Sequence, residues 1–154
     1  LVVDIRAVDE GEAGVTVEAE RIAHRFGVGL EWIAADPRTR GLPVGGLADS
    51  MCASGLLLAC AHHRSELSAA ACIGGNPHLA GDALESVAAP ILLVVGENDL
   101  DSLSAARTAQ RNLGVSELAV INDTRSVVDE PEAFFAAAYR IRDWFVDHLA
   151  TEAH

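Results

Sequence analysis

The sequence predicts an α/β fold in which a mostly parallel sheet is covered by helices on both faces. Short, continuously apolar runs alternate with longer segments of helical periodicity along the chain, and such runs are typical of parallel strands buried on both sides. The chain has 154 residues, 50% of them apolar, which suits one domain of ordinary size. We therefore expect a single domain over residues 1–150 and a short tail over 151–154.

Each predicted strand is one of the apolar runs, and the predicted helices lie between them. We expect strands at residues 1–5, 42–48, 68–74, 90–95 and 116–121. We expect helices from Thr16 to about Asp36, over 51–63, over 101–113 and from Pro131 onward, with one short helix inside the loop 76–87. Thr16 is a typical N-cap residue, Pro37 would close the first helix, and Pro131 suits a first helical position.

The last predicted helix carries an apolar stripe at helical spacing, which predicts the face that packs on the core. Its members are Phe134, Ala138, Ile141, Phe145 and Leu149.

Composition and charge argue against several classes of partner. A formal net charge of −12 argues against nucleic acid and anionic membranes, because both are polyanions. No apolar run reaches the roughly 18 residues that a membrane span requires. Cys52, Cys60 and Cys72 lack the paired spacing of a zinc site, so we expect buried thiols in a reducing cytoplasm and neither a metal nor a cofactor.

Candidate catalytic residues follow the predicted strands, because ligands of such sheets bind beyond the carboxyl ends of the strands. Ser50 lies in a turn between a strand and a helix, flanked by the small residues Ala48 and Cys52, which is the setting of a nucleophile elbow. On residue pattern alone, an ordinary helix N-cap is the favoured role for Ser50. Asp99 follows the strongest strand and could orient a catalytic histidine or cap the next helix, and the residues do not choose between these roles.

A histidine that would complete a Ser–Asp–His triad is missing after the last predicted strand. The sequence has no histidine between His78 and His148. A serine hydroxyl cannot take this role, since it does not accept and return a proton near neutral pH, whereas imidazole titrates near ~6.5.

These segments together resemble the dienelactone-hydrolase-like α/β-hydrolases, including bacterial hydrolase domains joined to a phosphoribosyltransferase domain. The resemblance covers essentially the whole chain and is carried by Leu-Glu-Trp-Ile, Gly-Leu-Pro-Val-Gly, Gly-Gly-Asn-Pro-His-Leu-Ala-Gly-Asp-Ala-Leu and Ala-Pro-Ile-Leu-Leu-Val-Val-Gly-Glu-Asn-Asp. It implies an α/β-hydrolase fold whose N-terminal strands, with one loop of the oxyanion hole, would lie before Leu1.

The resemblance also implies a place for each catalytic group. The nucleophile falls on Ser50, within Ala-Asp-Ser-Met-Cys where relatives have Gly-x-Ser-x-Gly, and the acid falls on Asp99. The histidine position falls on Ser126, within Thr-Arg-Ser-Val-Val where relatives have a segment like Ala-Thr-His-Leu-Phe. One oxyanion donor would be the backbone of Met51.

The function implied is that of a hydrolase relative that is weakly active or inactive, because Ser126 stands at the position of the base. One alternative is an active serine hydrolase on a small ester or lactone, with Ser50 and a non-standard base such as His78. Another is a non-catalytic assembly domain of a larger phosphoribosyltransferase-linked protein. An incomplete sheet edge would also admit a homo-oligomer or an upstream domain as partner.

Overall fold

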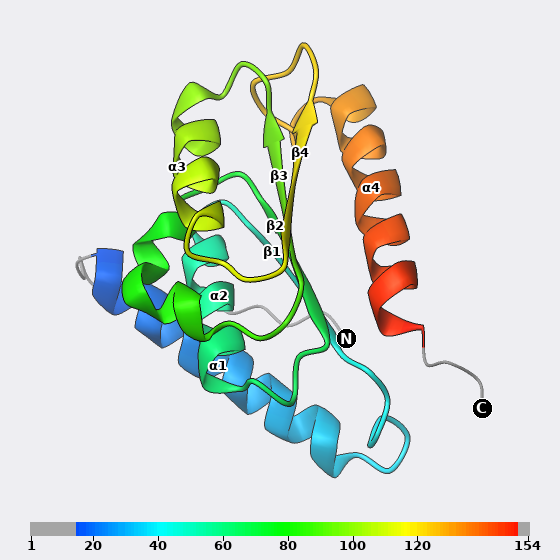
Figure 1. Cartoon of the computed structure of the whole chain (residues 1–154). Coiled ribbons are helices and arrows are strands. Elements are labelled where there is room, and N and C mark those ends of the chain that lie inside the picture. The colour runs from blue at the N-terminus through cyan, green and yellow to red at the C-terminus, as the bar shows by residue number, and fades with distance from the viewer. Residues whose placement is uncertain (1–14, 151–154) are drawn as a thin grey trace.

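The computed structural model describes residues 15–150, which form four strands, four α-helices and one 3₁₀ segment (Figure 1). The strands are β1 (Gly45–Asp49), β2 (Ala69–Ile73), β3 (Ile91–Gly96) and β4 (Ser116–Ile121). The helices are α1 (Val15–Ala35), α2 (Cys52–His62), α3 (Leu100–Gln110) and α4 (Pro131–Leu149), and the 3₁₀ segment η1 spans Pro77–Ser86.

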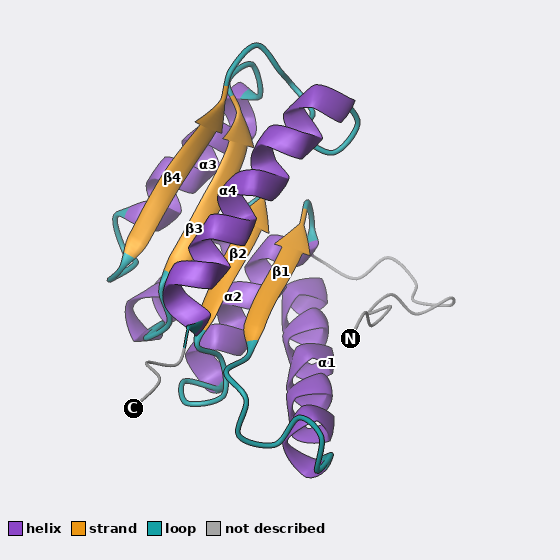
Figure 2. Ribbon diagram, turned by 90° about the vertical axis from the view of Figure 1, so that its right-hand side faces the viewer, coloured by secondary structure: helices purple, strands orange, loops and turns teal. Residues whose placement is uncertain are grey.

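The strands form one parallel sheet in the order β1-β2-β3-β4. Helix α4 lies on one face of this sheet, and α1, α2 and α3 lie on the other (Figure 2). The predicted α/β architecture, a parallel sheet with helices on both faces, is therefore confirmed. The strand predicted at residues 1–5 lies outside the described residues.

Strand β3 shows why the apolar runs are continuous. Ile91, Leu93 and Val95 belong to the core cluster under α2 and α3, whereas Leu92 and Val94 belong to the cluster under α4. Alternate side chains of a strand point to opposite faces of the sheet. Since both faces are covered, both sets of side chains must be apolar.

Strand β1 is shorter than the prediction of 42–48 and begins at Gly45, which pairs with Ala69. Pro43 has no backbone N–H and cannot donate to a strand ladder, so the paired segment starts beyond it.

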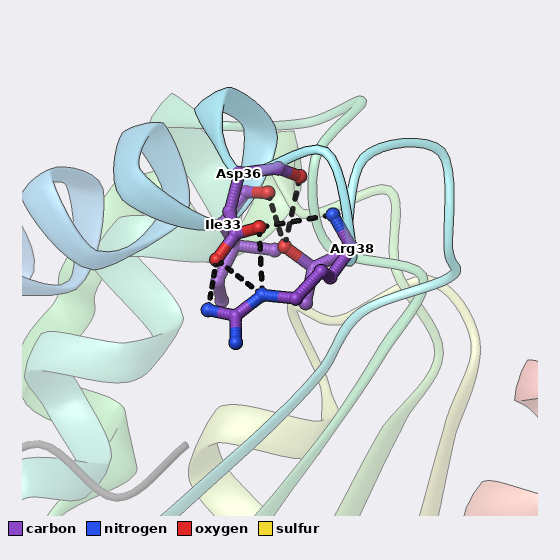
Figure 3. A network of polar contacts seen from close by, with 4 residues as sticks. Ile33, Asp36 and Arg38 are labelled. Atoms are coloured by element: carbon purple, nitrogen blue, oxygen red, sulfur yellow. Dashed lines mark hydrogen bonds and ion pairs between the residues drawn. The ribbon is translucent and has the colours of Figure 1, made fainter.

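Helix α1 ends at Ala35, close to the predicted boundary, and Asp36 organises the turn that follows (Figure 3). The Asp36 carboxylate accepts from the backbone N–H of Arg38 at 2.9 Å and from its guanidinium at 2.6 Å. These hydrogen bonds from Arg38 hold the pKa of the Asp36 carboxyl below its usual range. Pro37 between them cannot continue the helical hydrogen bonds, so the chain turns here toward β1.

The core-facing stripe predicted for the last helix is wrong in part. The buried residues of α4 are Ala133, Ala137, Ile141 and Trp144, whereas Phe134 is 46% exposed and Ala138 is also exposed. Alanine at the contact lets the helix backbone approach the sheet closely, and the bulky neighbouring ring then lies toward solvent.

Within residues 15–150, none of the helices combines the length and the apolar character needed to cross a membrane.

Candidate active site

One cavity of about 310 Å³ lies at the carboxyl ends of the four strands and is lined by the loops that follow them. Ser50, Asp99 and Ser126, the three positions that the resemblance assigned to the triad, all line it, and so does Met51. Its remaining lining residues are Ile73, Gly74, Gly75, Asn76, Gly96, Ser102, Arg125, Val127 and Val128. The topology therefore brings together residues that lie up to 78 positions apart in the sequence, from Ser50 to Val128.

Ser50 sits in a sharp, strained turn between β1 and α2. Its φ is +47°, in the left-handed region that is costly for a residue with a side chain. Its N–H donates to the Ile73 carbonyl at 2.9 Å, which continues the pairing of β1 with β2 up to the turn. A strained strand-to-helix turn that presents a serine at the top of the sheet is the geometry of a nucleophile elbow.

The N-cap role that the residue pattern favoured for Ser50 is wrong. The residue that flanks α2 is Met51, and no side chain makes a capping hydrogen bond there. N-cap residues also have extended backbone, whereas Ser50 has positive φ. The Met51 N–H, at the start of α2, donates to no acceptor within residues 15–150.

Asp99 combines the cap that the sequence suggested with a place in the cavity. Its Oδ1 accepts from the Ser102 N–H at 3.1 Å, which caps α3. Its Oδ2 receives no hydrogen bond from the described part of the chain. The carboxylate is thus fixed by one oxygen, while the other remains available to a donor in the cavity.

Ser126 is engaged in a structural contact. Its Oγ donates to Asp129 Oδ2 at 2.6 Å, and its N–H donates to Glu130 Oε1 at 3.3 Å, as does the N–H of Arg125. Contact with the Thr124 side chain, followed by the Ser126 N–H, lowers the pKa of the Glu130 carboxyl. Two carboxylates therefore hold the loop after β4, and the cavity lining contains no histidine.

His78 lies in η1 and does not line the cavity that contains Ser50. Its Nδ1 is buried and has no hydrogen-bond partner among the described residues. This arrangement gives no geometric support to His78 as a base for Ser50.

The cysteines lie apart from this chemistry. Cys60 and Cys72 are buried free thiols. Burial raises the pKa of Cys60 to about 12 and also raises that of Cys72, so both stay protonated and unreactive. Cys52, the first residue of α2, is half-buried and packs against the core.

Within residues 15–150, no group of three or more His, Cys, Asp or Glu side chains is placed to hold a metal ion.

The sequence reasoning missed the cavity walls formed by Gly74, Gly75, Asn76 and Arg125. Gly74 is the last residue of the strand predicted at 68–74, Gly75 and Asn76 follow it directly, and Arg125 lies four residues beyond the strand predicted at 116–121. Their places in the sequence therefore pointed to this edge of the sheet. They were not singled out because none of them is a usual nucleophile, acid or base.

Comparison with known proteins gives this chain relatives of two kinds. Two proteins named as phosphoribosyl transferases, from two strains of Mycobacterium tuberculosis, are each 38% identical to it over 133 residues. The match covers 86% of this chain and 30% of each of those proteins. No family model matches the chain.

The second kind of relative is found among solved structures. A dienelactone hydrolase from Anabaena variabilis superposes with a TM-score of 0.79 at 30% identity, covering 88% of this chain and 62% of that one. An α/β-hydrolase enzyme from a sediment metagenome of the Mar Chica lagoon has a TM-score of 0.65 at 15% identity, covering 84% and 70%, which shows the fold alone. In fold and in sequence, the chain is similar to the dienelactone-hydrolase-like α/β-hydrolases.

Proposed function

We propose that this chain is a hydrolase-related domain that binds a small ester or lactone at the Ser50 cavity and hydrolyses it weakly or not at all. One observation carries the proposal. The cavity gathers Ser50, Asp99 and the Ser126 position, but the group at 126 is a hydroxyl bonded to Asp129 instead of an imidazole.

Attack by Ser50 requires a group that takes its proton and returns it. The Ser126 hydroxyl cannot do so near neutral pH, and the guanidinium of Arg125 offers only N–H donors and no acceptor. In well-studied triads, loss of one member leaves only about 10³–10⁴-fold catalysis over water. Ser50 would therefore act as a fixed hydroxyl that contacts a ligand, with little nucleophilic activity.

The cavity has features that suit binding of an ester or lactone, although it lacks a base. The Met51 N–H is unpartnered within the described residues and lies at the start of α2, the positive end of the helix dipole. A carbonyl oxygen placed there would accept a hydrogen bond without displacing a protein group. Ile73, Val127 and Val128 add an apolar wall, which suits the hydrocarbon part of a small ester or lactone.

Two measurements test the proposal: ester turnover tests the lack of catalysis, and ligand titration tests binding at the cavity. The protein is incubated with p-nitrophenyl butyrate, and its rate is compared with that of Ser50→Ala; we expect the two rates to agree within about twofold. Binding is followed by titrating a small lactone into ¹⁵N-labelled protein, where we expect shifts of the Met51 and Asn76 amides and none at Asn122. Efficient turnover that Ser50→Ala abolishes would overturn the proposal, and so would the absence of shifts at the cavity.

A second candidate function follows from the Mycobacterium relatives, which are named as phosphoribosyl transferases and match 86% of this chain. The domain would then act as a non-catalytic assembly partner of a phosphoribosyltransferase domain. Co-expression with that domain of the relative, followed by co-purification, tests this candidate. Failure to co-purify at micromolar concentration would count against it.

We also propose a cytoplasmic location, because Cys60 and Cys72 are buried free thiols and such thiols suit a reducing compartment. Fractionation of cells that express the protein should recover it with cytoplasmic markers, and recovery with an extracytoplasmic fraction would contradict the proposal.

A further inference from the structure

The turn after β2 forms the wall of the cavity next to Ser50. Gly74 and Gly75 both have left-handed backbone, with φ of +61° and +74°. The Gly74 N–H donates to the Val94 carbonyl at 2.8 Å, and the Ser50 N–H donates to the Ile73 carbonyl at 2.9 Å. The turn is therefore tied to β3 on one side and to the Ser50 elbow on the other.

Gly75 meets the backbone of Ser50 at very short range. A Cβ added to Gly75 would lie 1.9 Å from the Ser50 carbonyl oxygen, 2.6 Å from its carbonyl carbon and 3.0 Å from its Cα. Real Cβ atoms essentially never come closer than 3.0 Å to such atoms. Because the atoms it would meet are backbone, no side-chain rotation could relieve the clash, and any larger residue at 75 would displace the elbow.

We infer that Gly75 is a positioning residue of the Ser50 elbow. Its bare Cα lets the β2–η1 turn pack against the Ser50 carbonyl and so hold the strained serine and the adjoining Met51 N–H in place. A strained residue persists only where its surroundings over-determine it, and this contact supplies one such constraint. The inference rests on the proposed function only in taking Ser50 and Met51 as the groups that meet the ligand.

The chain contains matched controls for glycine replacement. Gly41 and Gly81 also have positive φ, +82° and +56°, but a Cβ at either position would meet nothing within 4 Å. Alanine at 41 adds no collision to the strain of positive φ. Gly81 has a ψ of −137°, near a region that is essentially confined to glycine, so alanine at 81 incurs a larger backbone strain, also without a collision. Alanine at 75 adds the collision with Ser50 to the strain of positive φ.

A double-mutant cycle on the full chain, with urea unfolding as the readout, separates these effects. We expect Gly41→Ala to shift the folding equilibrium roughly tenfold toward the unfolded state, and Gly75→Ala about a hundredfold or more. In a Ser50→Gly background the elbow can change φ, so the effect of Gly75→Ala should fall by about tenfold while that of Gly41→Ala stays the same. The Met51 amide resonance should move in Gly75→Ala and stay in both controls.

Equal effects of Gly75→Ala and Gly41→Ala would overturn the inference, as would an effect of Gly75→Ala that is the same in both backgrounds. If Gly75→Ala does not fold, the Gly75→Ala/Ser50→Gly double variant decides. Recovery of a folded state supports the inference, and failure to recover overturns it. Turnover does not enter this test, so its failure would leave the proposed function standing.

Discussion

Replacing Ser126 by histidine should install the general base that the cavity lacks. Position 126 lines the same cavity as Ser50 and Asp99, and Asp99 Oδ2 has no hydrogen bond within the described residues, so it can accept from an imidazole N–H. A positioned general base contributes roughly 10²–10⁴-fold to rate. We expect the lower end, about 10²-fold, because Asp129, which now binds the Ser126 hydroxyl, would compete for the imidazole.

The substitution should also lower the free energy of unfolding by about 1 kcal/mol, since it removes the Ser126–Asp129 hydrogen bond. Ser126→Ala is the matched control, because it loses that hydrogen bond and supplies no base. The assay is kcat/KM for p-nitrophenyl butyrate between about pH 5 and 9. Only deprotonated imidazole acts as a base, so the rate of Ser126→His should rise as pH passes upward through about 6.5.

One outcome would show that a histidine at 126 does not act as a base for Ser50. If Ser126→His is folded, as its amide spectrum would show, and is no faster than Ser126→Ala, then Ser50 and position 126 do not form a catalytic pair. A gain that survives in Ser126→His/Ser50→Ala would equally show that the new histidine acts without Ser50.

Three further predictions concern stability and thiol reactivity. Ser50→Gly should raise the free energy of unfolding by up to about 1 kcal/mol, since glycine tolerates the φ of +47°, and lower stability in urea would contradict this. Gly55→Ala should lower the free energy of unfolding by about 1–3 kcal/mol, because its Cβ would lie 2.3 Å from a side-chain atom of α1. Gly29 lies in α1, where an added Cβ would meet nothing within 4 Å. Gly29→Ala should therefore raise the free energy of unfolding by about 0.5–1 kcal/mol, measured by the same urea titration. Cys60, whose pKa burial raises to about 12, and Cys72 should resist a thiol reagent at about pH 8 until urea unfolds the chain, and rapid reaction in the native state would refute their burial.

The fold could be predicted from the sequence because, in a strand buried on both faces of the sheet, every residue is apolar. The five consecutive apolar residues from Ile91 to Val95 fill two core clusters alternately, so the run itself indicates a central parallel strand. The face of α4 could not be predicted in the same way. Large apolar residues suggested the contact, whereas the sheet accommodates Ala133 and Ala137 and leaves Phe134 at the surface.

The residues of the candidate site could be predicted where a reactive side chain follows a parallel strand. Ser50, Asp99 and Ser126 follow parallel strands, so their convergence at one edge of the sheet could be expected. The conformation of Ser50 could not, because serine is also a common N-cap and its φ depends on packing against distant backbone. The contact between Gly75 and Ser50 could not be predicted either, since the two residues are 25 positions apart in the chain and come together only in the folded sheet.

We propose that Ser50 occupies a hydrolase elbow in a cavity without a base. Labelling of the unaltered protein with a fluorophosphonate, followed by mass spectrometry of the peptide that contains Ser50, tests it most directly. We expect no labelling above that of Ser50→Ala under conditions in which Ser126→His is labelled. Rapid, stoichiometric labelling of Ser50 in the unaltered protein would contradict it.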